Sequence, residues 1–276
     1  MGDAYVVASE TCAFDVVGAK YIRDINPGEL LIISDNGIET DQFTSTVDHT
    51  ICSMEYIYFS RPDSNIDNIN VHAARKNMGR VLANEAPVEA DVVIGVPDSS
   101  ISAAIGYAEE SGIPYEIGLI KNRYVGRTFI QPSQELREQG VKMKLSPVRS
   151  IVEGKRVVMV DDSIVRGTTS RRIVQMLRDA GASEVHVRIG APPIKNPCYY
   201  GIDTSTREEL IAASKTVEEM CQEIGADTLE FISLDGLLGA IGRKHASPNR
   251  GQCTACFTGC YPTVIYDENE LIHSHN

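Results

Sequence analysis

The chain has 276 residues, enough to bury one large core together with a smaller appendage. Its formal net charge of −12 at pH 7 argues against general binding to nucleic acid, which needs a basic face. No apolar run is long enough to span a bilayer and the first residues do not form a secretion signal, so we expect a cytoplasmic protein without membrane attachment. Its seven cysteines then indicate reduced thiols or metal ligands rather than disulfides.

The first cysteine, Cys12, lies in an apolar setting beside Ala13, Phe14 and Val16. Free cysteine behaves as a small apolar side chain and is often buried. We therefore expect Cys12 to be a core residue rather than a catalytic thiol.

A strand, a polar turn and a helix are predicted between residues 91 and 110. Asp91–Val96 is apolar after its first residue, Pro97–Ser100 has turn composition, and Ile101–Glu110 has helical periodicity with small residues. Taken alone, this pattern is typical of an ordinary strand-to-helix turn with a serine cap. It becomes a candidate ligand loop only in combination with a second loop of the same kind.

A basic segment follows a predicted strand at Tyr115–Ile120. Between Lys121 and Arg156 there are nine basic and three acidic residues, a local charge of +6 in an acidic chain. Such a run can be a solvated face. Its length and its glycines and prolines are also typical of a lid, and we prefer the interpretation of a lid over an anionic ligand.

The most informative stretch runs from Lys155 to Ser170. Val157–Val160 is a short β-branched run, which predicts a strand buried in a parallel sheet. Asp161 and Asp162 then stand at its carboxyl end, where ligands bind in open α/β sheets. The loop that follows enters a predicted helix whose first N–H groups can hold a phosphate. A solvated strand end with a capped helix is the simpler alternative for the acidic pair alone.

The glycine-rich tail contains the spacing Cys253-x-x-Cys256. This spacing alone fits half of a zinc site, a redox pair or half of an iron–sulfur site.

The whole run from Lys155 to Ser170 resembles the signature of the type I phosphoribosyltransferases, which bind phosphoribosyl pyrophosphate (PRPP). The resemblance implies that Asp161 and Asp162 hold the ribose hydroxyls and, with Ser99, the Mg²⁺ shell. It implies that the 5′-phosphate is held by Arg166, Gly167, Thr168, Thr169 and Ser170. It further implies that Asp98, Ser99, Ser100 and Lys121 bind the pyrophosphate end of PRPP, and that Arg123 and Tyr124 act in catalysis.

Six further segments narrow the resemblance to the family of glutamine PRPP amidotransferases, in its iron–sulfur, Bacillus-like branch. They are Cys52–Phe59, Arg61–Asn65, Val96–Ser100, Lys121–Pro132, Tyr200–Thr204 and Gly251–Gly259. The family's N-terminal glutaminase domain is expected to be mostly absent, together with its N-terminal cysteine nucleophile, because Tyr5–Ser34 resembles only the end of that domain. We therefore expect a β-rich glutaminase remnant over 1–45, a phosphoribosyltransferase domain over 46–240 and a cysteine-bearing tail over 241–276.

The same resemblance implies a [4Fe–4S] cluster on Cys52, Cys198, Cys253 and Cys256, with Cys221 as a helical core residue. Zinc or an alternative cluster ligation through Cys260 is the other possibility that the spacing leaves open.

The expected fold is α/β, of the type I phosphoribosyltransferase kind, with a mostly parallel sheet between helices. The resemblance implies an Mg²⁺-dependent enzyme that makes 5-phosphoribosylamine from PRPP and ammonia, the first committed step of purine synthesis. It implies purine nucleotides as inhibitors, a homo-oligomer, and a separate glutaminase or other source of ammonia.

Two alternative functions are a base-salvage phosphoribosyltransferase and a PRPP-sensing regulator. Acidic residues outnumber basic ones in the segment before residue 48, which argues against DNA binding by such a regulator.

Overall fold

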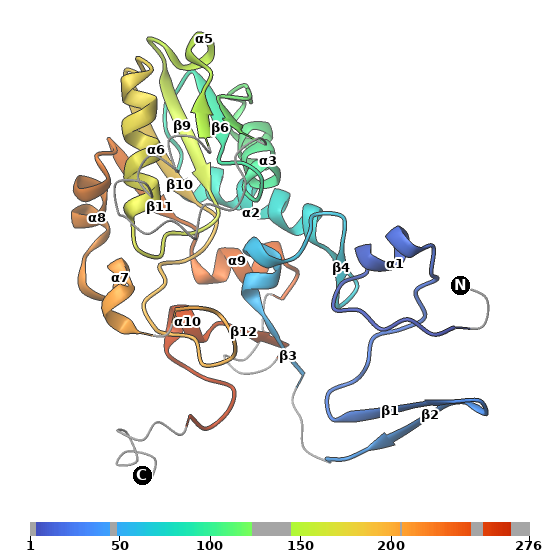
Figure 1. The fold of residues 1–276 in the computed structure, drawn as a ribbon. Coiled ribbons are helices and arrows are strands. Elements are labelled where there is room, and N and C mark those ends of the chain that lie inside the picture. The colour runs from blue at the N-terminus through green and yellow to red at the C-terminus, as the bar shows by residue number, and fades with distance from the viewer. Residues whose placement is uncertain (1–3, 45–48, 123–144, 205, 244–250, 266–276) are drawn as a thin grey trace, which may run out of the picture.

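The computed structural model describes residues 4–44, 49–122, 145–204, 206–243 and 251–265. Its centre is a four-stranded parallel sheet in the order β11-β10-β9-β6 (Figure 1). These strands are β6 (Val92–Gly95), β9 (Arg156–Asp161), β10 (Glu184–Ile189) and β11 (Thr228–Phe231). Because helices cover both faces of the sheet, β6 and the stretch 157–160 of β9 are continuous runs of buried apolar residues.

Helices lie on both sides of this sheet (Figure 1). The helices α2 (Val71–Glu85), α3 (Ile101–Ser111) and α9 (Leu234–Ala240) lie on one side, and α6 (Thr168–Asp179) and α8 (Val217–Ile224) lie on the other. The predicted α/β class, with its parallel sheet between helices, is confirmed.

The path of the chain reverses between β6 and β9. After β6 and α3 the chain returns to the edge of β6 that faces away from β9, where Tyr115 forms a parallel bridge with Val93. After β9 and α6 it moves the other way, to β10. Right-handed connections therefore place α3 and α6 on opposite faces, which opens a switch point at the carboxyl ends of β6 and β9.

The predicted elements around this point are confirmed, with two corrections. The predicted strand at Tyr115–Ile120 was wrong in extent, because Tyr115 makes a single bridge and the strand β7 spans only Leu119–Lys121. The predicted lid, from Lys121 to Arg156, was too long. Its last residues instead form β8 (Leu145–Pro147), α5 (Arg149–Val152) and the start of β9. Residues 123–144 of that segment lie outside the described residues.

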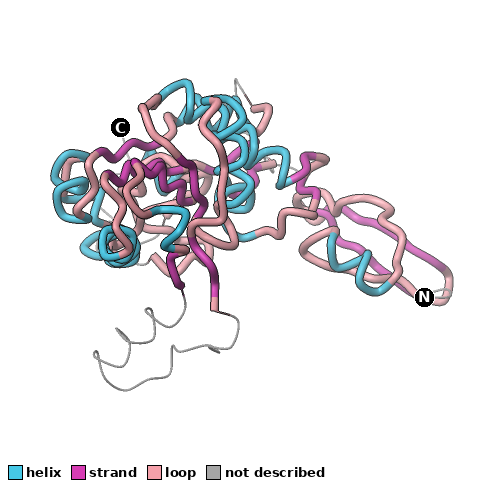
Figure 2. Tube along the Cα trace, turned by 90° about the horizontal axis from the view of Figure 1, so that it is seen from above, coloured by secondary structure: helices cyan, strands magenta, loops and turns pink. Residues whose placement is uncertain are grey.

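The N-terminal part of the chain extends away from the sheet (Figure 2). It contains the short helix α1 (Cys12–Val17) and an antiparallel hairpin of β1 (Glu29–Ser34) and β2 (Gly37–Gln42). Cys12 is buried, as predicted. The remaining short elements are β3 (Thr50–Cys52), η1 (Glu55–Phe59), β4 (Asn65–Ile66), β5 (Ile69–Asn70), η2 (Arg207–Glu209), α7 (Ile211–Ser214), β12 (Gly251–Cys253) and α10 (Ala255–Thr258).

Helices α2 and α3 approach closely through glycine. A Cβ added at Gly106 would lie 1.9 Å from the carbonyl oxygen of Lys76, so neither helix can keep its place with a larger residue there. We expect Gly106→Ala to lower the free energy of unfolding by roughly 1–3 kcal/mol, the usual cost of overpacking. Chemical denaturation measures this, with the surface change Ser111→Ala near the end of α3 as the control. Equal stability of the two variants would contradict the close packing described here.

Candidate active site

Two polar loops meet at the carboxyl ends of β6 and β9. Asp161 is the last residue of β9, and the Pro97–Ser100 turn follows β6. The Ser100 hydroxyl donates a hydrogen bond to Asp161 Oδ1 at 3.0 Å, and the Ser99 hydroxyl donates to Asp162 Oδ2. The structure therefore brings together residues that are 61 to 63 positions apart in the sequence, at the switch point of the sheet.

The two adjacent carboxyl groups resist ionisation. Burial, and after it the charge of Asp162, raise the pKa of Asp161 to about 8. Burial also raises the pKa of Asp162, although hydrogen bonds from Ser99 and Ser163 and the charge of Arg75 oppose the shift. An added positive charge would reverse both shifts, because it favours the ionised forms.

These carboxylates suit Mg²⁺, which is commonly held by one or two protein carboxylates together with substrate phosphates. In the described part of the chain, no three histidine, cysteine, aspartate or glutamate side chains are grouped so that they could hold a metal ion. The donor set of Asp161, Asp162 and the Ser99 hydroxyl nevertheless fits a hard cation that takes its other ligands from a substrate.

The loop after β9 ends at Gly167, which has a φ of 74° and lies directly before α6. A Cβ at this position would lie 2.8 Å from Ile211 Cδ1, so both the conformation and the packing require glycine. Thr168 and Thr169 form the exposed first turn of α6. Gly167 has no side chain that could cap the helix, and the first N–H groups of α6 are suitable donors to an anion.

Two other predicted phosphate ligands, Arg166 and Ser170, have surroundings that differ from those of the exposed Thr168 and Thr169. The Arg166 guanidinium lies 2.6 Å from Glu209 Oε2 in an exposed ion pair. Ser170 is buried on the inner face of α6. Arg166 is therefore paired with a carboxylate, through Nη2, at the end of this loop.

A lysine lies beside the loop that follows β6. Lys121 Nζ, at the end of β7, lies 2.7 Å from Asp98 Oδ2, and both side chains are exposed. The peptide bond between Pro97 and Asp98 is cis. The predicted catalytic residues Arg123 and Tyr124 lie outside the described residues.

A buried arginine near the acidic pair was missed by the sequence analysis. Arg75, on α2, is 2% exposed, and its guanidinium donates to the carbonyl oxygens of Tyr56 and Ser60, each at 2.8 Å. Burial lowers the pKa of Arg75, while Asp162 is the largest of the charges that oppose this shift. The sequence analysis predicted no element at this position, and an arginine between Ala74 and Lys76 does not by itself identify a partner.

The elements β3, β12 and α10 lie near one another, away from the helices that flank the sheet (Figure 1). Strand β12 pairs in parallel with β3, and Cys253 is the register partner of Cys52. The Lys195 and Asn196 N–H groups both donate to the Cys256 carbonyl oxygen, at 2.9 and 3.0 Å. These bonds hold the loop that carries Cys198 against α10.

The four thiols affect one another electrostatically. Burial, and after it the neighbouring Cys253 and Cys198, raise the pKa of Cys52 to about 11. Burial also raises the pKa of Cys256, with Cys52, Cys253 and Cys198 as the further causes. The other three predicted ligands thus all act on Cys256, and all four cysteines are free thiols.

The remaining cysteines differ from these four. Cys260 is exposed, and its N–H donates to the Thr258 hydroxyl. Cys221, in α8, packs partly buried against the core, and its thiol lies 3.3 Å from the Ala226 carbonyl oxygen.

Comparison with known proteins identifies the class of domain. Residues 64–196 match the phosphoribosyl transferase domain family. Together with the switch-point sheet, this match defines a phosphoribosyltransferase domain. The predicted resemblance to glutamine PRPP amidotransferases is also confirmed. The chain is 74% identical to the amidophosphoribosyltransferase of Bacillus subtilis over 99% of its own length. It is 57% identical to the amidophosphoribosyltransferase of Staphylococcus aureus over 98% of its own length.

A solved structure supports the same resemblance. The B. subtilis glutamine PRPP amidotransferase complexed with ADP and GMP superposes with a TM-score of 0.90, at 75% identity over 97% of this chain. The chain spans 57% of the B. subtilis sequence, 55% of the S. aureus sequence and 59% of the solved chain. None of the helices in the described residues is long and apolar enough to cross a membrane.

Proposed function

We propose that the switch-point site transfers the phosphoribosyl group of PRPP to ammonia, as in the first committed step of de novo purine synthesis. The observation that carries this proposal is the pairing of Asp161 and Asp162 with the Ser99–Ser100 turn, beside the open N-terminus of α6. The high identity to amidophosphoribosyltransferases favours ammonia over a purine or pyrimidine base as the acceptor.

In the proposed complex, each part of PRPP meets one part of the site. The 5′-phosphate lies on the first turn of α6, with Gly167, Thr168 and Thr169, and draws Arg166 from its ion pair with Glu209. Arg166 and Ser170 complete the proposed phosphate loop. The ribose hydroxyls lie on the acidic pair. The pyrophosphate lies on the turn from Asp98 to Ser100 and draws on the charge of Lys121.

The proposed reaction breaks the bond between C1 of the ribose and the pyrophosphate oxygen, and forms a bond from C1 to the ammonia nitrogen. The nitrogen loses one proton, and the products are 5-phosphoribosylamine and pyrophosphate. Loss of a leaving group from a sugar C1 develops positive charge on the ring, as in glycoside hydrolysis. Carboxylates beside the ribose stabilise this charge, and cations at the other end stabilise the leaving group. Arg123 and Tyr124 are proposed to act in catalysis from the basic segment.

The proposal includes a Mg²⁺ ion and an iron–sulfur cluster. Mg²⁺, held through Ser99, Asp161, Asp162 and the substrate, would neutralise charge on the pyrophosphate. A [4Fe–4S] cluster would be held by Cys52, Cys198, Cys253 and Cys256, because four thiolates are its usual ligand set.

The proposed organisation follows the resemblance. Residues 1–45 would be a glutaminase remnant, 46–240 the transferase domain and 241–276 the cysteine-bearing tail. The related B. subtilis structure holds ADP and GMP, which supports purine nucleotides as inhibitors. We further propose a cytoplasmic homo-oligomer that receives ammonia from solution or from a separate glutaminase.

One assay tests the acceptor. With Mg²⁺ and labelled PRPP, we expect ammonium to support formation of 5-phosphoribosylamine, and we expect that glutamine does not replace it through Cys12, because that thiol is buried. Free purine and pyrimidine bases should give no nucleotide. Turnover with a base in place of ammonium would replace the proposal with base salvage. Turnover on glutamine, in protein free of contaminating glutaminase, would show a nucleophile that this account lacks.

A further inference from the structure

Three tyrosines lie together beside two of the proposed cluster ligands. Tyr199 and Tyr200 directly follow Cys198, and Tyr261 comes five positions after Cys256. The centroid of the Tyr261 ring lies 5.1 Å from that of Tyr199, with the planes at 62°. It lies 6.3 Å from that of Tyr200, with the planes at 59°. Aromatic side chains prefer such inclined pairs to a face-to-face stack, so the three rings form one packed group.

A glycine turns the chain back toward the loop that carries Cys198. Helix α10 ends at Thr258, and the N–H of Gly259 donates to the Ala255 carbonyl oxygen at 2.8 Å. Gly259 has a φ of 77°, and a Cβ there would lie 3.4 Å from Asn196 Oδ1. Glycine adopts this conformation without strain and allows the close approach to Asn196. The turn therefore returns the following residues, with Tyr261 among them, to the loop after Asn196.

Hydrogen bonds of the tyrosine hydroxyls join the two segments. The Tyr261 hydroxyl donates to the Pro197 carbonyl oxygen at 2.7 Å. The Tyr200 hydroxyl lies 2.9 Å from Thr263 Oγ1 and accepts a bond from the Thr263 N–H at 3.3 Å. Buried phenol groups usually find such partners. The segment after α10 is thus fastened to the loop that carries Cys198 by one bond from each side.

The same tyrosines lie close to the thiols. The Tyr200 N–H donates to Cys198 Sγ at 3.4 Å. Burial, and after it Tyr199, raise the pKa of Tyr261 to about 12. Cys198 and Cys256 are further causes of this shift, so both thiols lie near the neutral Tyr261 phenol. Both of these cysteines are partly buried, whereas Tyr199 and Tyr200 are each 45% exposed.

We propose that Tyr199, Tyr200 and Tyr261 form an aromatic cover over the iron–sulfur site, and that this cover slows the release of iron to solvent. The inference rests on the cluster of the proposed function and concerns the residues around its ligands. An apolar shell around a metal site controls the access of solvent to the metal. Solvent exposure and hydrogen bonds to sulfur, such as that from the Tyr200 N–H, also tune iron–sulfur clusters.

The rate of iron release under anaerobic conditions tests the cover. Anaerobically purified protein is mixed with an excess of a ferrous-iron chelator, and formation of the coloured chelate is followed. We expect Tyr261→Ala to release iron roughly tenfold faster than the wild-type chain, at the lower end of the effects of residues around a metal site. Tyr199→Ala should give a smaller increase. Tyr261→Phe loses only the bond to Pro197 and keeps the ring, so it should retain most of the slow release.

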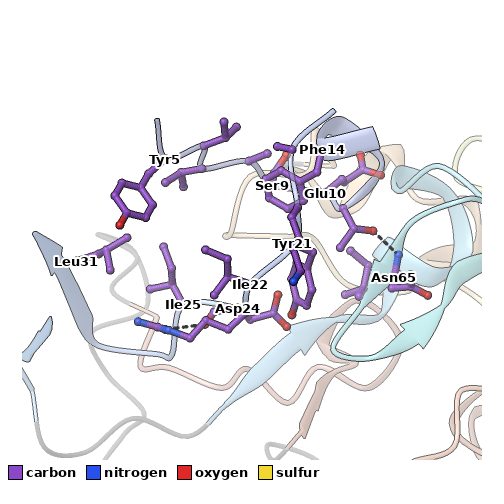
Figure 3. Close-up of a pocket in the computed structure, with 18 of the residues that line it drawn as sticks. Tyr5, Ser9, Glu10, Phe14, Tyr21, Ile22, Asp24, Ile25, Leu31 and Asn65 are labelled. Atoms are coloured by element: carbon purple, nitrogen blue, oxygen red, sulfur yellow. Dashed lines mark hydrogen bonds between the residues drawn. The ribbon is translucent and has the colours of Figure 1, made fainter. Parts of the chain in front are cut away.

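Tyr5→Ala is the matched control. Tyr5 is 46% exposed, much like Tyr199, but it lies in the N-terminal part of the chain, across a cavity from Leu31 (Figure 3). Its loss should leave the rate of iron release unchanged. The iron content before chelation and the denaturation midpoint are measured on every variant. Because Tyr199 is exposed, Tyr199→Ala should fold and decides the test if Tyr261→Ala is insoluble.

Two results would overturn only this inference. The first is an iron-loaded wild-type chain whose rate of release is unchanged in both alanine variants. The second is faster release only in variants whose denaturation midpoint also falls, because a general loss of stability would then explain the release. Wild-type protein that contains no iron and sulfide would reject the cluster of the proposed function, and its cover with it. Iron-loaded protein without ammonium-dependent turnover of PRPP would reject the proposed reaction and leave the cover in place.

Discussion

Asp161→Asn and Asp162→Asn should each lower PRPP turnover by on the order of tenfold to a thousandfold, the range seen when a positioned electrostatic group is lost. The amide keeps the size of the side chain and some of its hydrogen bonds, but it removes the charge that we propose to hold Mg²⁺ and to face the cationic ribose. Steady-state release of pyrophosphate with ammonium as the acceptor measures the effect. Asp179→Asn, at the far end of α6, is the matched acidic control and should leave turnover unchanged.

The same variants distinguish a functional pair from a structural one. Burial raises the pKa of both carboxyl groups, so the folded protein opposes their ionisation in the absence of a cation. Replacing either by a neutral amide should therefore not lower the denaturation midpoint in Mg²⁺-free buffer. Wild-type turnover in either variant would show that the pair is only the end of a strand, and unfolding of both would show that their role is structural.

Substituting serine for Cys253 or Cys256 should abolish both the brown colour and the soluble expression of the protein. The cluster would join residues about 200 positions apart, Cys52 and Cys256. By analogy with a disulfide, closing such a loop stabilises the folded chain by roughly 5 kcal/mol in the chain-entropy model. That gain is comparable to the whole stability of a modest domain. Anaerobically purified wild-type protein should contain about four irons and four sulfides per chain.

Two other cysteines serve as controls for the ligand set. Cys221→Ser and Cys260→Ser should keep iron, colour and solubility, because neither side chain is among the charges that shift the pKa of Cys52, Cys253 or Cys256. Cys198→Ser should lose the cluster. Retention of iron in Cys198→Ser, with its loss in Cys260→Ser, would contradict the assignment and place Cys260 among the ligands.

Much of the switch-point site could be predicted from local sequence. A buried β-branched run predicted β9 and placed Asp161 at its end, and the same reasoning placed the Ser99–Ser100 turn after β6. Parallel strands in one sheet share an edge for their carboxyl ends, so the two loops were expected to converge. Their hydrogen bonds confirm that convergence.

What could not be predicted depends on contacts between distant segments. The register that sets Cys52 opposite Cys253 comes from the pairing of β3 with β12, for which a three-residue strand carries almost no local signal. Arg75 lies near the acidic pair because α2 packs beside the sheet, and its hydrogen bonds go to backbone oxygens that no side-chain pattern reveals. The strand predicted at Tyr115–Ile120 failed because the chain leaves the main sheet after a single bridge.

The most direct test of the account is a crystal structure of this chain with Mg²⁺ and an unreactive PRPP analogue. We predict the 5′-phosphate at the first turn of α6, beside Gly167 and Thr168, and the ribose hydroxyls on Asp161 and Asp162. The pyrophosphate group should lie near Ser99 and Lys121. Ordered analogue bound elsewhere, or with its ribose away from the acidic pair, would contradict the proposed site.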